Sequence, residues 1–241
     1  MVNIRIHAEL QKCLASKQVQ SKILTMKLKL LLLSFSVLGF FLHVQAQDST
    51  TDADTDTDDI PNVVIDTSMG SIIIELYPDK APLNVAHFLK QVDNDHYDGI
   101  VFHRVMTGFV IQAGSFDENY KKHTVNETVD NEARRSVFNK KGTIAMAQKP
   151  GDQNSASSDF FINLVDNSHL DYRSAGSLQG RADGYTVFGK VIEGMDVVEK
   201  IAAVAVETKK FEDPPLKLEN CPVDNIVINE VRRVDDENSI E

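Results

Sequence analysis

The sequence predicts a mainly β protein, an antiparallel barrel or sandwich that carries two helices. Short runs rich in Val, Ile and Phe recur between residues 62 and 234, and segments containing Gly or Pro separate most of them. Such runs are typical of antiparallel strands. Only two segments have the 3.6-residue apolar period of a helix, and strands and helices do not alternate as they do in βαβ proteins. We therefore do not expect a parallel nucleotide-binding sheet.

The composition excludes several classes of partner and site. The chain has 241 residues and a formal net charge of -11, whereas binding of nucleic acid requires a clustered basic face. With no Trp and 5 Tyr, the chain lacks an aromatic platform for stacking bases. Its two cysteines, Cys13 and Cys221, make neither a metal site nor a disulfide framework by themselves. We expect no nucleic acid, no metal and no cofactor.

Residues 26–46 have the three parts of a signal peptide. Lys27 and Lys29 form a positive n-region, residues 30–42 form an apolar h-region, and residues 44–46 have the small-x-small pattern of a cleavage site. The alternative is an uncleaved anchor, but the apolar run is short for a spanning helix and a polar, acidic segment follows it. We expect a periplasmic protein without stable membrane insertion after cleavage, with secretion as the alternative.

The other terminal segments are not expected to fold. Residues 1–25 precede the signal and resemble none of its parts, so this extension is doubtful and Met26 is a candidate start. Residues 47–60 are dense in Asp and predict an acidic disordered linker, because like charges repel and bury nothing. The acidic tail at residues 235–241 is similar. Residues 61–234 remain as one folded domain.

Two strands open this domain. Residues 62–67 and 71–77 are rich in Val and Ile. The short gap at residues 68–70 contains a Gly, which is typical of a hairpin.

A helix follows the hairpin and ends near Asp93. Pro82 suits the first helical turn, and Asp79 is placed to cap the helix start. The apolar face has the spacing i, i+3, i+4 and i+7. It consists of Val85, Phe88, Leu89 and Val92.

The segment 102–114 combines strand periodicity with unusual polar residues. Apolar residues alternate with polar ones on both sides of a turn at residues 107–108, as expected of two half-buried strands. Arg104 and Gln112 are the polar members that stand beside aromatic rings. An Arg on a sheet surface usually faces water or pairs with a carboxylate, so this segment alone does not establish a functional site.

The remaining elements follow a long polar segment at residues 115–141. They are three strands, a second helix and a closing strand, with loops rich in Gly, Ser, Asn and Asp between them. The strands are predicted at residues 142–147, 159–164, 185–191 and 225–234, the loops at residues 148–158 and 171–184, and the helix after Gly194, with Met195, Val198, Ile201 and Ala202 on its apolar face.

No common catalytic motif accompanies these elements. The patterns G-x-S-x-G and H-E-x-x-H and the P-loop are absent from the sequence. A secreted hydrolase that used His103 and a nearby acid would lack a nucleophile motif. Because His103 alternates with Arg104, we expect His103 to point into the core. The residues alone predict an exported β domain with a patch rich in Arg and aromatic side chains.

The segment Phe102-His103-Arg104, followed by Gly-Phe-Val-Ile-Gln-Ala-Gly at residues 108–114, resembles the cyclophilin family. Three later segments resemble further cyclophilin strands in the same order, and together the likeness covers residues 62–234. These segments are residues 142–147, 159–163 and 187–195. The resemblance implies a closed eight-stranded antiparallel barrel capped by two helices, and peptidyl-prolyl cis-trans isomerase activity. The bacterial secreted or periplasmic branch fits best.

The resemblance also implies roles for individual residues. Arg104 takes the place of the catalytic arginine, and Gln112 that of the amide that holds the substrate backbone. Ala147 and Gln148 match a pair that contacts the substrate chain, and Tyr185 falls where many eukaryotic members have a histidine. The positions that match the proline pocket are Phe109, Val110, Phe161 and Leu170.

Three positions depart from the family pattern. His169 replaces a tryptophan that binds cyclosporin, so we expect weak affinity for that drug. Asp159 replaces a glutamine beside the pocket, which places an acid within possible reach of Arg104. Ala113 replaces one glycine of a pair, which is a mild change.

An arginine suits this chemistry because of what happens to the amide in the transition state. Rotation about an X-Pro bond has a barrier of roughly 18–20 kcal/mol, since the amide loses its conjugation. In the twisted state the prolyl nitrogen recovers its lone pair, and a guanidinium N–H can then donate a hydrogen bond to it. The planar ground state offers no such acceptor, so the interaction is selective for the transition state.

The sequence leaves two functional hypotheses. The first is an active isomerase that acts on proline-containing, unfolded or partly folded exported proteins, as a monomer. The second is a cyclophilin-like peptide-binding module or chaperone with little isomerase activity, in which Asp159 pairs with Arg104 and diverts the guanidinium.

Overall fold

The computed structural model describes residues 61–180, 182–212 and 215–234. The predicted signal peptide, the acidic linker and the acidic tail fall on residues 1–60 and 235–241, outside the described residues. Within the described part, no helix is both long enough and apolar enough to cross a bilayer.

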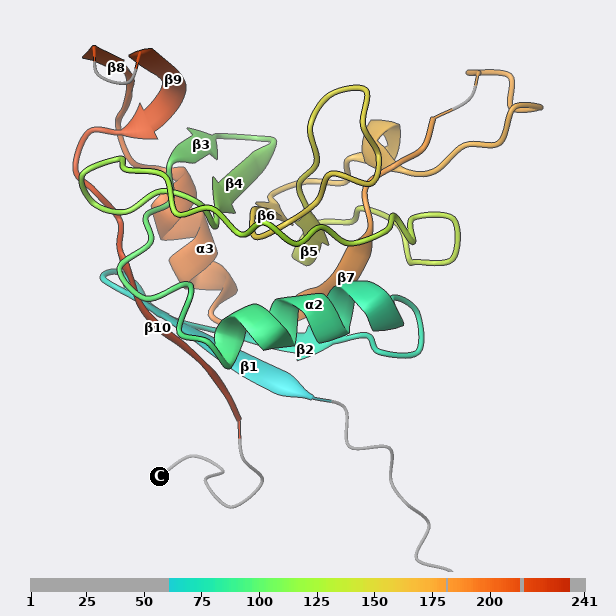
Figure 1. The fold of residues 1–241 in the computed structure, drawn as a ribbon, viewed down its shortest axis with the longest axis horizontal. Helices are drawn as coiled ribbons and strands as arrows, with labels where there is room; N and C mark the ends of the chain where they lie inside the picture. Colours follow the sequence, from blue (N-terminus) through green and yellow to red (C-terminus); the bar gives the residue numbers. More distant parts are fainter. Residues whose placement is uncertain (1–60, 181, 213–214, 235–241) are drawn as a thin grey trace, which may run out of the picture. The chain divides into compact units, whose positions relative to one another are not determined.

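Ten strands, two α-helices and one 3-10 helix make up the described part of the chain (Figure 1). In chain order these are β1 (Asn62–Thr67), β2 (Gly70–Leu76), α2 (Pro82–Val92), β3 (Arg104–Met106), β4 (Val110–Ala113), β5 (Thr143–Met146), β6 (Phe160–Asn163), η1 (Ser168–Leu170), β7 (Val187–Glu193), α3 (Met195–Ala202), β8 (Val206–Glu212), β9 (Pro215–Pro222) and β10 (Ile228–Arg233).

Eight strands form one antiparallel sheet in the order β10-β1-β2-β7-β5-β6-β4-β3. The mainly β prediction with two helices is confirmed, but the closed barrel is wrong, because the sheet is open and strongly curled. Its end strands, β3 and β10, share no ladder among the described residues. The segment before β3 does form backbone hydrogen bonds with the chain before and at the start of β10, including one from the Ile228 amide to the Ile100 carbonyl at 2.8 Å. The Phe102 amide donates to the Ile226 carbonyl at 2.9 Å, and Val101 forms an isolated bridge with Val227.

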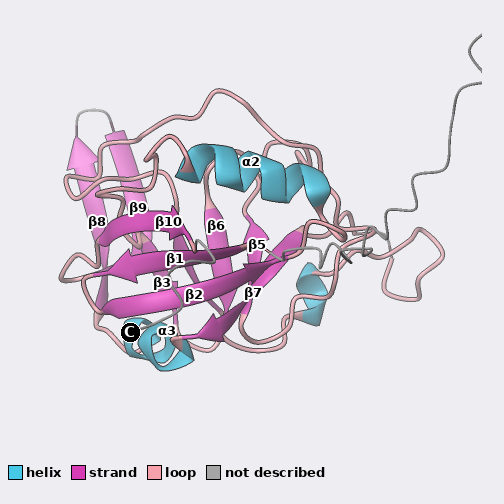
Figure 2. Ribbon diagram, turned by 90° about the horizontal axis from the view of Figure 1, so that it is seen from below, coloured by secondary structure: helices cyan, strands magenta, loops and turns pink. Residues whose placement is uncertain are grey.

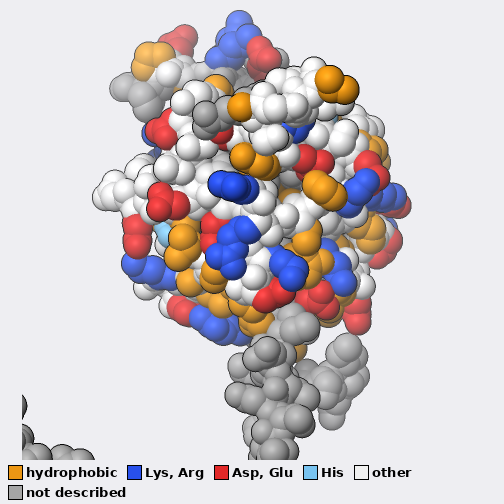
Figure 3. Space-filling view, turned by 90° about the vertical axis from the view of Figure 1, so that its right-hand side faces the viewer, with side chains coloured by type: hydrophobic (Ala, Val, Ile, Leu, Met, Phe, Trp, Pro, Cys, Tyr) orange, Lys and Arg blue, Asp and Glu red, His pale blue; other side chains and the backbone are white. Residues whose placement is uncertain are grey.

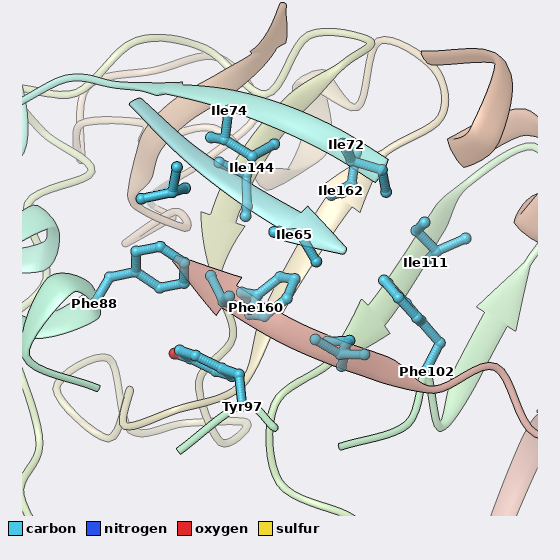
Figure 4. Packing of buried hydrophobic residues seen from close by; sticks show 14 of the residues in the cluster. Ile65, Ile72, Ile74, Phe88, Tyr97, Phe102, Ile111, Ile144, Phe160 and Ile162 are labelled. Atoms are coloured by element: carbon cyan, nitrogen blue, oxygen red, sulfur yellow. The ribbon is translucent and has the colours of Figure 1, made fainter. Parts of the chain in front are cut away.

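The concave side of this sheet holds the main core (Figure 4). Side chains at every second position of β1 and β2 point inward, among them Ile65, Ile72 and Ile74. Phe88 from α2 meets the Phe160 ring of β6 edge to face at 6.0 Å between centroids. Burial of aliphatic and aromatic side chains of this size contributes about 1.5–3 kcal/mol each. Strand periodicity and the apolar stripe of α2 therefore converge on one core.

The strands lie between the two helices in Figure 2.

Asp79 does not cap α2, which corrects the sequence prediction. The residue at the N-cap is Ala81, and its side chain makes no capping bond. Instead Glu132, from a distant loop, accepts hydrogen bonds from the Asn84 backbone amide at 3.0 Å and from the Asn84 side chain at 2.8 Å. A buried carboxylate thus satisfies the first turn of the helix from outside the segment.

Strands β8 and β9 form a second, two-stranded antiparallel sheet that the sequence analysis did not predict. Most of its side chains are charged or exposed. Three partly buried apolar residues pack against a small cluster with Cys221, and these are Phe211, Leu216 and Leu218. The apolar positions alternate, but the Lys and Glu residues between them obscure the strand signal in the sequence.

The surface has no large region of one charge on the face shown in Figure 3. Acidic, basic and apolar side chains are interspersed there. Several acidic and basic side chains also form exposed ion pairs, such as Lys141 with Glu199 at 2.7 Å. Exposed pairs of this kind contribute little to stability.

Candidate active site

Three of the predicted site residues, Arg104, Gln112 and Phe161, lie in one row across the sheet. The antiparallel register places Arg104 of β3 opposite Gln112 of β4, Gln112 opposite Phe161 of β6, Phe161 opposite Ala145 of β5, and Ala145 opposite Val187 of β7. Because side chains alternate between the faces of a strand, residues of one row share a face. This row faces away from the main core.

The neighbouring row faces the other way. In this row, each residue lies opposite the next across β3, β4, β6 and β5, and all four are buried in the main core. In that order they are Val105, Ile111, Ile162 and Ile144. The alternation in segment 102–114 therefore serves two purposes. One set of side chains holds the sheet to its core, and the other builds a site on the opposite face.

The guanidinium of Arg104 is oriented by three neighbours. Its Nη1 donates a hydrogen bond to Gln112 Oε1 at 3.2 Å, and its Nη2 lies 2.7 Å from the sulfur of Met106. Its Cζ lies 6.0 Å from the centroid of the Phe109 ring. A polar donor is thus held over an aromatic face at the edge of the sheet.

Phe109 is fixed on both its backbone and its ring. Its carbonyl accepts hydrogen bonds from the Leu164 amide at 2.9 Å and from Asn167 Nδ2 at 3.0 Å. Its ring stacks on the imidazole of His169, with 5.5 Å between centroids and 23° between planes. The 3-10 helix η1 therefore supports one wall of the site.

These residues enclose a pocket of about 290 Å³. Two of its apolar lining residues, Val110 and Phe161, belong to a buried cluster that also contains Ala145 and Val187. The lining residues are Arg104, Phe109, Val110, Gln112, Ala147, Gln148, Pro150, Phe161, Leu170 and Tyr185. Such a pocket suits a small apolar ring with one polar atom facing the guanidinium.

The structure brings together most of the residues singled out from the sequence. Two of them, Asp159 and His169, do not line this pocket. His169 contributes indirectly, through its stacking on Phe109. One lining residue, Pro150, was missed, because it lies in a loop recognised only by its composition. Its position two residues after Gln148 was the only available signal.

Asp159 does not pair with Arg104, which corrects the second functional hypothesis. Its Oδ2 accepts a hydrogen bond from Ser115 Oγ at 2.9 Å. Its Oδ1 is inaccessible to solvent and has no hydrogen-bond partner among the described residues. Burial raises the pKa of this carboxyl from 3.8 to about 6, although the Ser115 hydrogen bond and the charge of Lys122 act in the opposite direction.

The backbone explains where Asp159 points. At Gly114, φ is +130°, and a Cβ there would lie 2.3 Å from the Ser158 carbonyl oxygen. Only glycine permits this close approach. It brings the start of β6 against the end of β4, where Asp159 and Ser115 lie within hydrogen-bonding distance.

A second cavity of about 450 Å³ adjoins the pocket. Asp159 lines it together with Ser115 and Lys122. Gln112, Ala147, Gln148 and Pro150 line both cavities. These shared residues form the partition between the two spaces.

His103 is buried and lines neither cavity. Its ring packs edge to face on Phe116, with 5.0 Å between centroids. Burial, with smaller contributions from Arg104 and Lys122, lowers its pKa from 6.5 to about 4. This position gives no support to a hydrolase that uses His103.

Tyr185 and Gln148 line the same pocket as Arg104. The Tyr185 amide donates to the Leu170 carbonyl at 2.9 Å, and its ring meets the Phe161 ring edge to face at 5.5 Å. Gln148 Nε2 donates to the Gly184 carbonyl at 3.1 Å. Three separate loops thus close around the pocket.

The chain resembles proteins of one family. A family model described as "Cyclophilin type peptidyl-prolyl cis-trans isomerase/CLD" matches residues 62–232. Peptidyl-prolyl cis-trans isomerase B of Escherichia coli (strain K12) is 40% identical over 169 residues, which cover 70% of this chain and 99% of the relative. A peptidyl-prolyl cis-trans isomerase of Acinetobacter baylyi is 45% identical over 147 residues, covering 61% of this chain and 74% of the relative.

Solved structures resemble the fold. A cyclophilin-type isomerase of Cryptosporidium parvum, solved in the presence of the dipeptide Ala-Pro, aligns with a TM-score of 0.56 and 21% identity. The alignment covers 73% of this chain and 99% of that one. At this identity the likeness establishes the fold alone.

Proposed function

The chain belongs to the cyclophilin-type peptidyl-prolyl cis-trans isomerases, and we propose that it isomerises X-Pro bonds of exported proteins in the pocket beside Arg104. The observation that carries the assignment of the site is the cross-strand row. It sets a guanidinium and an amide beside the apolar side chain of Phe161, in a pocket of about 290 Å³.

Arg104 is the catalytic residue of this proposal. Its N–H donates a hydrogen bond to the prolyl nitrogen once the amide has twisted and the lone pair has become available. The hydrogen bond between Arg104 and Gln112 orients the guanidinium before the substrate arrives, so little reorganisation is needed during the reaction. Arg stays protonated at any relevant pH, whereas Lys lacks the planar fork of donors.

The apolar pocket supplies the rest of the catalytic effect. A hydrogen bond to a charged donor contributes about 1.5–3 kcal/mol. Each tenfold increase in rate requires the activation free energy to fall by about 1.36 kcal/mol. Arg104 therefore accounts for roughly one to two powers of ten. The apolar side chains of the lining pack against the proline ring and exclude water while the N-terminal part of the substrate rotates. These residues are Phe109, Val110, Phe161 and Leu170.

Gln148 offers the substrate a backbone partner. Its amide N–H and its carbonyl make no backbone hydrogen bond among the described residues, since the β5 ladder ends before it. An extended peptide can pair with these groups while its proline sits in the pocket. Ala147 beside it keeps this edge narrow.

The cellular setting of the proposal rests on the sequence. Residues 26–46 have the features of a cleaved signal, which supports periplasmic folding assistance to exported proteins, with secretion as the alternative. The clients are proline-containing, unfolded or partly folded chains, and the enzyme acts as a monomer.

The proposal is tested with a chymotrypsin-coupled assay on an Ala-Pro peptide. Arg104→Ala should lower kcat/KM by about tenfold to a hundredfold, which corresponds to the hydrogen-bond energy given above. The control is Arg232→Ala, which removes an exposed arginine of β10 that lies 3.9 Å from Glu230. This variant should match the wild type. A wild-type protein no faster than buffer, or an Arg104→Ala variant at full rate, would contradict the proposal.

A further inference from the structure

Asn131 lies in the loop before β5 and was not singled out by the sequence. Its side chain joins two segments that form the wall of the pocket. Nδ2 donates hydrogen bonds to Gln148 Oε1 at 3.0 Å and to the Gly184 carbonyl at 2.8 Å. Its Oδ1 accepts a hydrogen bond from the Ala133 amide at 2.7 Å. Both ends of this amide side chain are therefore used.

The same contacts fix the orientation of the Gln148 side chain. Gln148 receives a hydrogen bond on Oε1 from Asn131 and donates one from Nε2 to the Gly184 carbonyl at 3.1 Å. If the Gln148 amide turned over, its NH₂ would face the NH₂ of Asn131, and its oxygen would face a carbonyl oxygen. Both contacts would be repulsive. Asn131 thus selects one of the two orientations.

Gln148 and Gly184 both matter for the shape of the site. Gln148 lines the proline pocket and the adjoining cavity and forms part of the partition between them. Gly184 precedes Tyr185, which also lines the pocket. Gly184 is itself tightly placed, with φ of +72°, and a Cβ there would lie 2.4 Å from the Tyr172 amide nitrogen. The Gly184 carbonyl is therefore a fixed point, against which Asn131 holds Gln148.

Asn131 is in turn held by its neighbours. Its backbone amide donates to Asn154 Oδ1 at 3.0 Å. The next residue, Glu132, receives the hydrogen bonds of Asn84 at the start of α2, and its own amide donates to Thr186 Oγ1 at 2.8 Å. The position of Asn131 is thus held by Asn154, by the first turn of α2 and by the residue before β7.

From this geometry we propose that Asn131 is a positioning residue of the isomerase. It sets the width of the proline pocket by holding the Gln148 side chain against the Gly184 carbonyl, next to Tyr185. Asn131 lines neither cavity and acts through Gln148. The inference rests on the proposed function of the pocket. Asn131 affects the affinity for the substrate, whereas Arg104 stabilises the twisted state of the X-Pro bond.

Two substitutions separate this role from a purely structural one. Asn131→Asp keeps an oxygen that can accept the Ala133 amide, and so preserves the turn, but it loses the donors to Gln148 and Gly184 and adds a charge facing two oxygens. Asn131→Ala loses all of these contacts. We expect both variants to raise KM for an Ala-Pro peptide about tenfold, which corresponds to about 1.4 kcal/mol, with kcat within about twofold of the wild type. An Asp variant with wild-type KM would overturn the proposal.

A double-mutant cycle with Gln148→Ala tests whether Asn131 acts through Gln148. In the Gln148→Ala background, Asn131→Ala should change KM by less than about twofold, because the group that it positions is gone. Fully additive effects would overturn the proposal. The control is Asn94→Ala, which removes an exposed side-chain hydrogen bond to the Lys90 carbonyl at the end of α2. This control should leave KM unchanged.

An NMR measurement that does not depend on catalytic activity separates this inference from the proposed function. The Gln148 side-chain NH₂ signals in a ¹⁵N-correlated NMR spectrum should shift in Asn131→Asp and stay in place in Asn94→Ala. Unmoved Gln148 signals in the Asp variant would contradict the inference, whatever the activity. An inactive wild type in which these signals respond as expected would contradict the proposed function and leave the positioning role of Asn131 supported.

Discussion

Arg104 and Asp159 show how the role of one residue depends on contacts that its own sequence position does not reveal. Arg104 sits opposite Gln112 in the ladder, and that pairing directs the guanidinium toward the pocket. Asp159 precedes β6 and accepts a hydrogen bond from Ser115, next to the close approach of Gly114 to Ser158. The acid therefore neither tunes nor restrains the arginine by direct contact. The hypothesis of a binding module with little activity, which depended on that contact, has no support in the geometry.

The buried carboxyl of Asp159 makes stability depend on pH. Its pKa in the folded protein is about 6, against 3.8 ordinarily, so the folded state holds the proton more tightly than the unfolded state. The contribution of this group to the free energy of unfolding is therefore complete below pH of about 4 and is lost as the pH rises through about 6.

Asp159→Asn should remove this dependence while keeping an acceptor for the Ser115 hydroxyl. The gain in unfolding free energy of the variant over the wild type should be larger at pH 7.5 than at pH 4.5, by about 2 kcal/mol. Urea unfolding at the two pH values measures it. The exposed Asp98→Asn variant serves as the control. An equal difference at both pH values would show that Asp159 is not the group responsible.

Helix α2 illustrates how an element can take its cap from a distant part of the chain. Neither Asp79 nor the N-cap residue Ala81 provides a side-chain cap. Glu132 provides the acceptor, from a loop that also carries Asn131. The stability of α2 and the shape of the groove therefore share one loop.

Glu132→Ala should lower the free energy of unfolding by about 1–3 kcal/mol, because it removes the acceptor of the buried Asn84 backbone amide and one of the two acceptors of the Asn84 side chain. Glu132→Gln keeps one oxygen and should lose less. Urea unfolding monitored by circular dichroism gives both values. The control is the exposed Glu199→Ala, whose ion pair with Lys141 is solvent-accessible. A Glu132→Ala variant as stable as this control would refute the distant cap.

At the scale of the whole molecule, the core and the candidate active site both lie within residues 61–234. Every residue of the main core cluster and of the pocket lining belongs to this range, and the family model covers nearly the same part, residues 62–232. The curled sheet needs no closure to form the site, because Arg104, Gln112 and Phe161 lie in one row across the neighbouring strands β3, β4 and β6.

A protein that begins at residue 61 should therefore fold and keep the isomerase activity of the protein that begins at Gln47. The expected kcat/KM values agree within about twofold in the chymotrypsin-coupled assay, with equal thermal unfolding midpoints. A loss of more than tenfold in the shorter protein would show that residues 47–60 contribute to the site. Mass spectrometry of the protein after expression with residues 26–46 checks the predicted cleavage after Ala46.

The sequence by itself determined the features that depend on local pattern. Strand periodicity predicted the strands of the main sheet, the helical period predicted α2 and α3, and the motifs from Phe102 to Met195 identified the family. These features are readable because alternation and turn chemistry act over a few neighbouring residues. The same motifs selected Arg104 and most of the pocket lining.

Only the tertiary structure decided the features that depend on contacts between distant segments. The open edge of the sheet, the sheet of β8 and β9, and the partner of Asp159 all result from such contacts. The same holds for Pro150 in the lining and for Asn131, which meets Gln148 and Gly184 across 17 and 53 residues of chain. A polar side chain in a loop has many possible partners, and global packing alone determines which one lies within hydrogen-bonding distance.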